Sequence, residues 1–550
     1  MRRWNGWGDP GTDYPLSDSG SAYLENALGP GVAYADASLE TALAAVPASR
    51  LDGGPGLSLD PQDRLLHARG QSLPDWVALR AGRIGTFPDA VAHPKTSGDI
   101  AELIDLAAAR QFNLIPYGGG TSVLGHINPL PSDRPVVTVD LRGLSRLIDL
   151  DKASRLATFE AGIRGPQVEA ALHEHGFTLG HFPQSFEFST LGGWVATRST
   201  GQQSLGYGRI EALFAGGHLE TPIGAVDFAP FPATASGPDL RQVVLGSEGR
   251  LGILTRAVVR IQPVPEREVF FAAFFSSWEA GVEAMRTMAQ ARLPLSMMRL
   301  SDPLETEATF ALAGRPGLVS WADRGLRLVG FGEGRSLLLA AATGEAGRVR
   351  QRRAEAHAVI RRHRGLPVGT PIGSMWRRTR FLAPYLRNTL WERGYALDTL
   401  ETAMPWSCVA AAVDSIRATL TDGLRGENER VLAFVHLSHA YPDGASLYAT
   451  YIFRRSADPP ETEARWRRLK TDATRQVLAH GGTLSHQHGV GLDHASFLVQ
   501  EKGPAGMAAL HALVSALDPQ GILNPGKLIG SHQLSVVSPQ SKPDSLKTEN

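Results

Sequence analysis

Pro116-Tyr117-Gly118-Gly119-Gly120-Thr121-Ser122 is the stretch around which the rest of this sequence is arranged. It follows the apolar residues 112–115, which predicts that a strand delivers a glycine turn. Glycine has no Cβ, so three in a row let several backbone N–H groups approach an anion closely. The turn is therefore either a simple tight connection or a cradle for a pyrophosphate.

Two common phosphate-binding loops are excluded by the residues around this turn. A P-loop requires a lysine after its last glycine, and no lysine lies nearby. A turn of the Rossmann type opens a helix, whereas Gly125, Pro129 and Pro131 interrupt the residues that follow here. If the turn binds a nucleotide, it belongs to another class.

The pattern around the turn indicates an α+β fold. Residues 90–93 are a predicted strand, and a helix that opens near Ser97 carries its apolar residues on one face. With the strand before the turn they predict a βαβ unit. Apolar runs at residues 136–141, 144–150 and 156–161 follow without a helix between them. Such a series favours an antiparallel or mixed sheet over a doubly wound one.

Two further glycine-rich loops follow later in the chain. One reads Ser189-Thr190-Leu191-Gly192-Gly193, and the other reads Gly246-Ser247-Glu248-Gly249-Arg250-Leu251-Gly252. Each lies beside a predicted sheet element and offers hydroxyl groups or backbone donors. One such loop is a turn, but three indicate a single extended ligand with several polar parts. Flavin adenine dinucleotide (FAD) is a ligand of this kind.

The composition describes an ordinary globular protein, with 43% hydrophobic and 20% charged residues. Basic and acidic residues balance at 55 each, so no nucleic-acid partner is expected. Cys408 is the single cysteine, which excludes an internal disulfide and a thiolate metal cluster. The metal sites open to this chain would therefore use other ligands.

Both ends of the sequence provide evidence about the cellular location of the protein. Arg2 and Arg3 are not followed by an apolar segment, so no secretory signal is predicted. No apolar run approaches the roughly 18 residues needed to span a bilayer. The last residues, Thr548-Glu549-Asn550, are not a peroxisomal signal. We therefore expect a cytoplasmic protein.

The three loops resemble the flavin-binding loops of the vanillyl-alcohol-oxidase, or PCMH-type, flavoproteins. Within that superfamily the chain is similar to the alkyldihydroxyacetonephosphate synthases of ether-lipid synthesis. The matching stretches run over nearly the whole chain: Arg3-Trp4-Asn5-Gly6-Trp7-Gly8, Gly180-His181-x-Pro183, Glu187-Phe188-Ser189-Thr190-Leu191-Gly192-Gly193-Trp194-Val195-x-Thr197-Arg198, Ser236-Gly237-Pro238-Asp239 and Ser485-His486-x-His488-Gly489-Val490-Gly491.

The resemblance implies a PCMH-type, two-subdomain FAD-binding fold with an α+β cap domain. The implied divisions are a helical N-terminal extension (1–84), the FAD-binding domain (85–265), the cap or substrate domain (266–490), a C-terminal helical segment that returns to the FAD domain (491–530) and a disordered tail (531–550). The tail is rich in Ser, Pro and Lys, which is typical of disorder.

The resemblance also implies FAD as the cofactor. We expect noncovalent binding, because neither the first glycine loop nor its neighbours offers the usual histidine for covalent attachment. The residues expected to bind FAD are Pro116, Tyr117, Gly118, Gly119, Gly120, Thr121, Ser122, Gln184, Ser185, Phe186, Glu187, Phe188, Ser189, Thr190, Thr197, Arg198, Ser199, Thr200, Glu248, Gly249, Arg250, Leu251, Gly252, Ile253 and Leu254.

Candidate proton-transfer groups lie in the second half of the chain. Tyr448, on a predicted strand, matches the catalytic tyrosine of the family, although a strand tyrosine taken alone is more often a packing residue. His486 and His488 match a run of three histidines in which Gln487 replaces the middle one. Because His486 and His488 are two residues apart, their rings would lie on the same face of an extended segment, and Gln487 would point to the opposite face.

Two histidines and two arginines complete the set of candidates. His436 and His439 are three apart on a predicted strand, so they should face opposite sides unless a bulge intervenes, and we expect no metal site there. Arg299 and Arg387 match arginines that the family uses for activity and substrate binding. A guanidinium suits a phosphate because it donates two parallel hydrogen bonds.

The basic and aromatic residues 376–391 allow two interpretations. They are either an amphipathic segment that contacts a membrane peripherally, or a helix packed on the cap and kinked at Pro384. The resemblance further implies a homodimer.

Function follows from the same resemblance. It implies a transferase that exchanges the acyl group of acyl-dihydroxyacetone phosphate for a fatty alcohol, through an adduct at flavin N5 and with no net redox. Tyr448 would move the carbon-bound proton, His486 and His488 would activate the alcohol, and Arg299 and Arg387 would hold charged groups. The alternative is an FAD-dependent D-2-hydroxy-acid dehydrogenase or oxidase.

Overall fold

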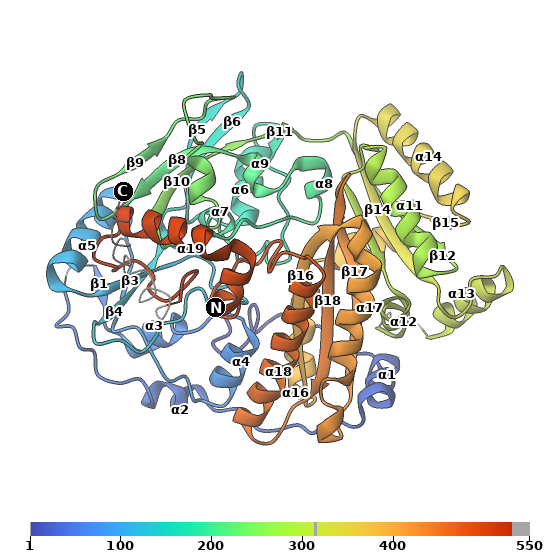
Figure 1. Cartoon of the computed structure of the whole chain (residues 1–550), viewed down its shortest axis with the longest axis horizontal. Coiled ribbons are helices and arrows are strands. Elements are labelled where there is room, and N and C mark those ends of the chain that lie inside the picture. The colour runs from blue at the N-terminus through green and yellow to red at the C-terminus, as the bar shows by residue number, and fades with distance from the viewer. Residues whose placement is uncertain (1, 55, 313–315, 531–550) are drawn as a thin grey trace, which may run out of the picture.

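The computed structural model describes residues 2–54, 56–312 and 316–530 (Figure 1). The predicted tail, 531–550, lies outside the described residues. The described part combines helices with four sheets, of which three are antiparallel, and this confirms the α+β class. Among the described helices, none is both long and apolar enough to cross a bilayer.

The glycine turn follows a small mixed sheet, in which one strand pair is antiparallel and two are parallel. Its strand order is β1 (Leu57–Ser58), β2 (Ala90–Ala92), β4 (Val136–Asp140) and β3 (Asn113–Tyr117). The predicted βαβ unit is present as β2, a helix and β3, and β4 lies between the two strands and pairs with both in parallel. All five residues of β4 are buried, as expected for a central strand covered on both faces.

The helix of this unit is α5 (Ser97–Arg110). A capping box between Thr96 and Asp99 starts it, and its apolar stripe, Ile100, Leu103, Ile104 and Ala107, is buried as predicted. The chain then enters an antiparallel sheet of order β5 (Leu147–Asp151), β6 (Leu156–Glu160), β10 (Ile253–Arg260), β8 (Phe214–Glu220) and β9 (Val226–Phe228). The second and third of the predicted runs, now β5 and β6, pair antiparallel as expected, whereas the first run is β4 and pairs in parallel in the other sheet.

Short elements fill the connections around these two sheets. They are α6 (Gly165–His173), β7 (Phe177–Thr178), α7 (Leu191–Thr197), α8 (Ser204–Tyr207), α9 (Ile210–Leu213), α10 (Arg241–Val244), β11 (Gln262–Pro263) and the 3-10 turn η1 (Leu141–Gly143).

A seven-stranded antiparallel sheet organises the second half of the chain. Its order is β15 (Leu366–Gly369), β12 (Arg267–Phe275), β14 (Ser336–Gly344), β13 (Met297–Ser301), β17 (Val431–Ala440), β18 (Gly444–Arg454) and β16 (Tyr395–Pro405). Alternate residues of β12 enter different cores: Phe271 and Phe275 pack in one cluster, and Phe270 and Phe274 pack in another. The sheet is therefore covered on both faces.

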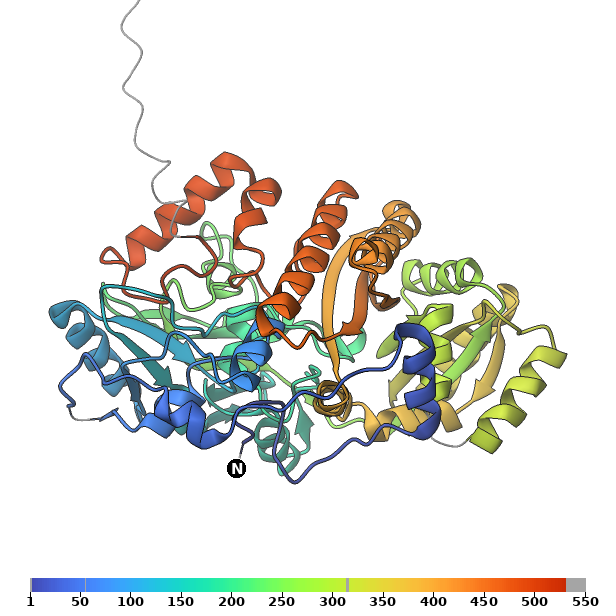
Figure 2. The ribbon, with the colours of Figure 1, turned by 90° about the horizontal axis from the view of Figure 1, so that it is seen from below.

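Helices cover this sheet along its length (Figures 1 and 2). They are α11 (Trp278–Gln290), α12 (Pro303–Leu312), α13 (Pro316–Leu328), α14 (Ala346–Arg362), α15 (Pro371–Thr379), α16 (Ala383–Glu392), α17 (Trp406–Asp422), α18 (Pro459–Ala479) and the turn η2 (Arg425–Glu427).

The N-terminal residues do not form a separate body. The helical extension expected over residues 1–84 contains four helices among the described residues: α1 (Asp18–Leu28), α2 (Leu39–Ala44), α3 (Pro61–Leu66) and α4 (Leu73–Arg80). Helix α1 packs against α12 and β17 of the second half (Figure 2). The first 30 residues thus extend across to the far half of the molecule.

The C-terminal helix returns to the first half of the molecule. It is α19 (Leu498–Leu517), preceded by the turn η3 (Ala495–Phe497), and it kinks at Gly503-Pro504. After it, Ile522 and Leu523 pack in the core of the mixed sheet, and the Asn524 N–H donates to the Leu114 carbonyl. The chain end is thereby fixed beside the strand that leads to the glycine turn.

Candidate functional site

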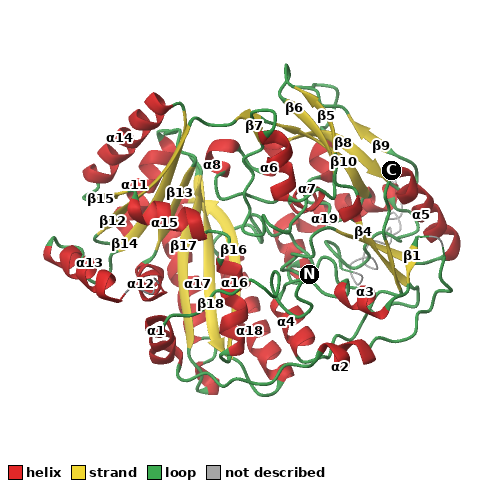
Figure 3. Cartoon of the chain, turned by 180° about the vertical axis from the view of Figure 1, so that it is seen from behind, coloured by secondary structure: helices red, strands yellow, loops and turns green. Residues whose placement is uncertain are grey.

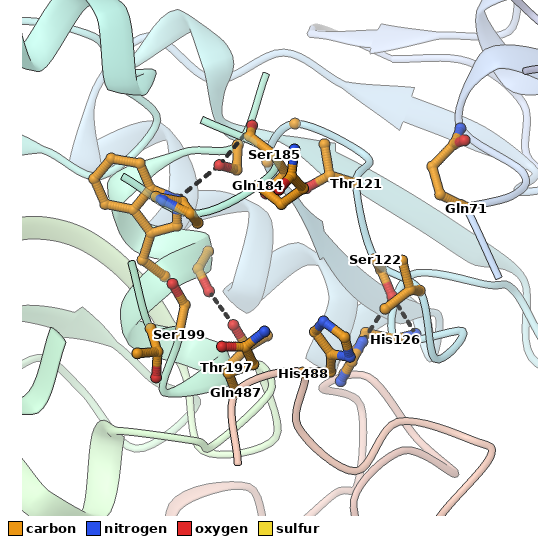
Figure 4. Close-up of a pocket in the computed structure, with 18 of the residues that line it drawn as sticks. Gln71, Thr121, Ser122, His126, Gln184, Ser185, Thr197, Ser199, Gln487 and His488 are labelled. Carbon is orange, nitrogen blue, oxygen red and sulfur yellow. Dashed lines mark hydrogen bonds between the residues drawn. The ribbon is translucent and has the colours of Figure 1, made fainter. Parts of the chain in front are cut away.

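A cavity of about 510 Å³ is lined by loops of the first half and by strands of the seven-stranded sheet. Loops gather in this region between the sheets (Figure 3), and Figure 4 shows polar side chains from several of them around the cavity. All three glycine-rich loops contribute residues to its wall. Segments that are far apart in the sequence therefore meet at one site.

The glycines of the first loop allow it to pack closely on its neighbours. A Cβ on Gly119 would stand 2.0 Å from the Phe188 carbonyl oxygen of the second loop. Gly120 has a φ of +63°, and a Cβ there would meet the Tyr117 hydroxyl at 2.1 Å. The Arg2 guanidinium donates to the carbonyls of Gly119 (3.0 Å) and Gly120 (2.8 Å).

The third loop reaches the first one directly. Gly249, with a φ of +75°, lies against the ring of Pro116, where a Cβ would approach to 2.9 Å. Glu248 adopts a φ of +53°, which is uncommon for a residue with a side chain. Its carboxylate is buried and lines the cavity.

Most of the residues expected to bind FAD line this cavity. They are Pro116, Tyr117, Gly118, Gly119, Gly120, Thr121, Ser122, Gln184, Ser185, Ser189, Thr190, Thr197, Ser199, Thr200, Glu248, Gly249, Gly252 and Leu254. The structure does not bring seven others to the wall: Phe186, Glu187, Phe188, Arg198, Arg250, Leu251 and Ile253.

These seven side chains have other partners or surroundings. Phe186 stacks on Phe381, and Phe188 contacts Trp7 edge-on. Arg198 donates to Gln242, and Arg250 donates to the Leu523 carbonyl. A carboxyl–phenol interaction links Glu187 to Tyr385. Leu251 and Ile253 belong to apolar clusters.

Tyr448 faces the cavity from β18. Its ring stacks on His436 at a centroid distance of 5.0 Å, and its hydroxyl donates to Thr399 Oγ1 at 3.2 Å. Burial raises the pKa of Tyr448 to about 12, while Arg299 acts in the opposite direction. The phenol is therefore protonated near neutral pH.

Arg299 belongs to a buried charged group beside Tyr448. Its guanidinium donates to Glu305 Oε1 at 2.7 Å and lies 3.2 Å from His436 Nδ1. Glu305 Oε1 is also 2.9 Å from His436 Nδ1, and Arg299 and His436 hold the pKa of Glu305 well below its usual range. Burial and the nearby guanidinium lower the pKa of His436. This cluster gives the cavity wall a fixed cation next to a neutral imidazole.

Arg387 enters the cavity from α16. It donates from Nη1 to the Gln71 carbonyl at 2.6 Å and lies over the Trp76 ring at 4.5 Å. Among the described residues, Nε and Nη2 have no protein hydrogen-bond partner although both are buried. Two donors are thus free for an anionic ligand in the cavity.

The predicted geometry of the histidine run is wrong. The segment is not extended: the N–H groups of His486, Gln487 and His488 all point to the carboxylate of Glu401, which requires a tight turn. Gln487 and His488 consequently line the cavity (Figure 4), whereas His486 does not. His486 Nε2 instead hydrogen-bonds the Tyr441 hydroxyl at 2.6 Å.

His436 and His439 also depart from the predicted arrangement. A register shift in β17 lies between Leu437 and His439, and both histidines line the cavity instead of facing opposite sides. Burial lowers the pKa of His439 to about 3, so its ring is neutral. Among the described residues, no group of three or more His, Cys, Asp or Glu side chains is placed to hold a metal ion.

Comparison with known proteins agrees with this arrangement of loops and strands. Residues 88–226 match the FAD binding domain family, and residues 264–528 match the C-terminal domain of FAD linked oxidases. The alkyldihydroxyacetonephosphate synthase of Trypanosoma brucei brucei is 31% identical over 86% of this chain and 78% of its own length. That of Caenorhabditis elegans is also 31% identical, over 85% of this chain and 80% of its own.

The chain belongs to the alkyldihydroxyacetonephosphate synthase family. A solved structure of an alkyldihydroxyacetonephosphate synthase superimposes with a TM-score of 0.82 and 25% identity, covering 95% of this chain and 98% of the other. The PCMH-type, two-subdomain FAD-binding fold and FAD as the cofactor, both expected from the sequence, are confirmed.

The residues around the cavity fit the FAD of this family. Buried polar atoms of its wall lack a protein hydrogen-bond partner within the described residues, among them Thr200 Oγ1 and Asn524 Oδ1. Buried polar groups are normally paired, so these atoms indicate a polar ligand. We propose that the eighteen predicted residues that line the cavity hold this cofactor.

Several lining residues were missed by the sequence-based prediction. Trp7 reaches the wall from the N-terminal segment, and Asp398 and Thr399 reach it from β16. Trp7 lies in a stretch that already resembled the family, so that stretch was the available signal. The others have no motif of their own, because only the pairing of β16, β17 and β18 brings them to the cavity.

The basic and aromatic stretch 376–391 forms two helices, not one. Helix α15 ends at Thr379, and Pro384 lies at the start of α16. Trp376, Pro384 and Arg387 line the cavity. The chain breaks before Pro384 because proline is tolerated in the first helical turn but not inside a helix.

Proposed function

We propose that this chain exchanges the acyl group of acyl-dihydroxyacetone phosphate for a fatty alcohol, as an FAD-dependent alkyl transferase with no net redox. The observation that carries the proposal is the joint placement of Tyr448, Arg299 and Arg387 at one cavity that the three glycine-rich loops also line. FAD, when bound there, supplies an isoalloxazine ring that can take part in the exchange without gaining or losing electrons overall.

Arg387 is suited to hold the substrate phosphate. Its two unpartnered donors form one edge of the guanidinium fork, which matches two phosphate oxygens. The Trp76 ring beneath the guanidinium fixes its plane. With its plane fixed, the guanidinium can present both donors to a phosphate in one orientation.

Tyr448 is suited to move a proton on the carbon skeleton. It holds a proton on its hydroxyl near neutral pH, and Thr399 Oγ1 accepts that proton in a hydrogen bond. Loss of this proton is assisted by Arg299, whose charge favours the phenolate. His488 contacts the Tyr448 ring edge-on at 5.9 Å and stays neutral, because burial lowers its pKa. It is placed to accept a proton from the alcohol.

The test is an exchange assay with the purified, FAD-loaded protein. Acyl-dihydroxyacetone phosphate and radiolabelled hexadecanol should yield labelled alkyl-dihydroxyacetone phosphate and an equal amount of free fatty acid. No oxidant should be consumed. Label that stays in hexadecanol under conditions where FAD is bound would contradict the proposal.

We also propose peripheral contact with a membrane by a homodimer in the cytoplasm, since the substrates of the proposed reaction are lipids. Support for the contact comes from α13, where Trp321 (75% exposed) and Leu328 (87% exposed) reach solvent. Co-sedimentation with phosphatidylcholine vesicles should fall in a W321S/L328S double variant, and sedimentation velocity should give the mass of a dimer.

A further inference from the structure

The loop from Ser485 to Gly491 carries Gln487 and His488 into the cavity but contains neither helix nor strand. A segment without regular structure keeps a defined shape only if its backbone N–H groups find partners. Here the partners are two buried carboxylates, Glu401 and Glu248, each 4% exposed. They come from opposite halves of the molecule.

Glu401 holds the first part of the loop. It lies on β16 directly opposite Tyr448 in the pairing with β18. Its carboxylate accepts hydrogen bonds from the N–H groups of His486 (2.7 Å), Gln487 (3.1 Å) and His488 (3.0 Å). The Ser485 hydroxyl donates to the same carboxylate at 2.5 Å. Four donors around one carboxylate fix the turn.

Glu248 holds the second part of the loop. It belongs to the third glycine-rich loop, and its carboxylate accepts from the N–H groups of Val490 (2.5 Å) and Gly491 (2.9 Å). Gly489, with a φ of +88°, lets the chain approach closely, since a Cβ there would meet Glu248 Oε1 at 2.7 Å. His126 Nε2 lies 3.3 Å from the same oxygen.

We propose that Glu401 and Glu248 are positioning residues for His488 and Gln487. Each carboxylate orients its part of the loop through hydrogen bonds to the backbone. His488 therefore lies beside Tyr448 only when the loop is bound by Glu401 from one half of the molecule and by Glu248 from the other. This inference rests on the proposed function, because it assigns the loop a role in that exchange. It also makes the position of His488 depend on how the two halves are placed relative to each other.

The experiment compares Glu401→Gln and Glu248→Gln with Glu169→Gln. Glu169 is a matched control: it is buried and accepts from the Thr178 hydroxyl (2.6 Å) and the Gly180 N–H (3.0 Å), but it does not line the cavity. An amide oxygen accepts fewer hydrogen bonds and the NH₂ group repels the N–H donors. Each loop variant should lower kcat for the exchange by about 100-fold with KM within twofold of wild type. Bound FAD should stay within twofold of wild type in Glu401→Gln, whereas in Glu248→Gln kcat is measured on the FAD-loaded fraction, because Glu248 is also one of the residues proposed to hold FAD.

Hydrogen–deuterium exchange supplies the second readout and needs no turnover. The amides of residues 486–488 should lose protection in Glu401→Gln, and those of 490 and 491 in Glu248→Gln, while Glu169→Gln leaves both protected. Ser485→Ala removes one donor to Glu401 and is the gentler variant should a glutamine variant not fold; it should lower kcat about tenfold at an unchanged Tm.

Loss of kcat no greater than in Glu169→Gln, or unchanged amide protection in the loop variants, would overturn the assignment. A wild-type protein that binds FAD but exchanges no alcohol would instead overturn the proposed function, and the amide protection would still test how the loop is held.

Discussion

At the scale of single residues, the cavity combines a phenol that keeps its proton with two arginines that have different partners. Burial raises the pKa of Tyr448 to about 12, and Arg299 is already paired with Glu305. Arg387 differs from Arg299 because two of its donors lack protein partners among the described residues. The two arginines therefore have separate tasks: Arg299 tunes the phenol, and Arg387 binds the substrate anion.

Replacement of Arg387 by lysine should raise KM for acyl-dihydroxyacetone phosphate by about 10- to 100-fold, because a lysine cannot donate two parallel hydrogen bonds. Affinity for FAD should change little. Steady-state kinetics with Arg377→Lys as the control make the comparison, since Arg377 is half-exposed and paired with Glu268. Equal KM values for the two variants would contradict the phosphate role.

Replacement of Tyr448 by phenylalanine should reduce the exchange rate by at least about 100-fold, because the proton-transfer group is removed from a site that keeps its shape. The variant should still bind FAD. Tyr395→Phe is the control, since its buried hydroxyl donates to the Gly29 carbonyl away from the cavity. A Tyr448→Phe enzyme with near wild-type turnover would exclude the assigned role.

Some residues at the site were predictable from the sequence and others were not. The glycine loops could be recognised in the sequence because close packing of the backbone requires residues without a Cβ, as at Gly119. The direction of His486 could not be predicted, because it depends on Glu401, which is far away in the sequence and belongs to a strand. Side-chain direction in a loop is set by such tertiary partners.

At the scale of elements, the N-terminal segment joins parts that the sequence suggested were separate. Arg2 donates to the carbonyls of the glycine turn, and Trp7 lines the cavity. The Trp7 backbone pairs with the Asn388 side chain through two hydrogen bonds of 3.1 Å, so α16 and its Arg387 are held by the same segment. An amino-terminal extension thereby becomes part of the site.

Replacement of Arg2 by alanine should weaken FAD binding by about tenfold or more, because charged hydrogen bonds to two carbonyls of the turn are lost. Recovery of flavin fluorescence on dilution measures the dissociation constant. Arg3→Ala is the control, since Arg3 contacts Asp13 at 3.5 Å and not the turn. An unchanged dissociation constant in Arg2→Ala would show that the turn keeps its shape without this contact.

At the scale of the whole molecule, strand alternation predicts the class of fold but not the order of strands. The antiparallel pair of β5 and β6 after the glycine turn is local and was predictable. The insertion of β4 between β2 and β3 is not local, and its five buried residues fit equally well in any central position. The site depends on this non-local order of strands. Hydrophobic periodicity alone therefore could not predict that the glycine-rich loops and the seven-stranded sheet line the same cavity.

Stability should depend on pH through buried histidines. Burial lowers the pKa of His181 from 6.5 to about 3, and the unfolded chain takes up a proton near 6.5. Its contribution is present above pH 6.5 and is lost as the pH falls from 6.5 toward 3, by ~1.4 kcal/mol per pH unit. Urea unfolding at a series of pH values should show a shallower loss in His181→Gln. His175→Gln, at an exposed position, should match wild type.

One measurement tests most directly the central claim, that an FAD cavity of this kind runs an exchange without net redox. The FAD-loaded protein is mixed anaerobically with D-lactate or D-2-hydroxyglutarate, and in parallel with acyl-dihydroxyacetone phosphate and hexadecanol, while the visible spectrum is recorded. The account predicts that the oxidised flavin bands persist with both hydroxy acids and return unchanged after alkyl product has formed. Bleaching by either hydroxy acid, without alkyl product in the parallel reaction, would contradict it.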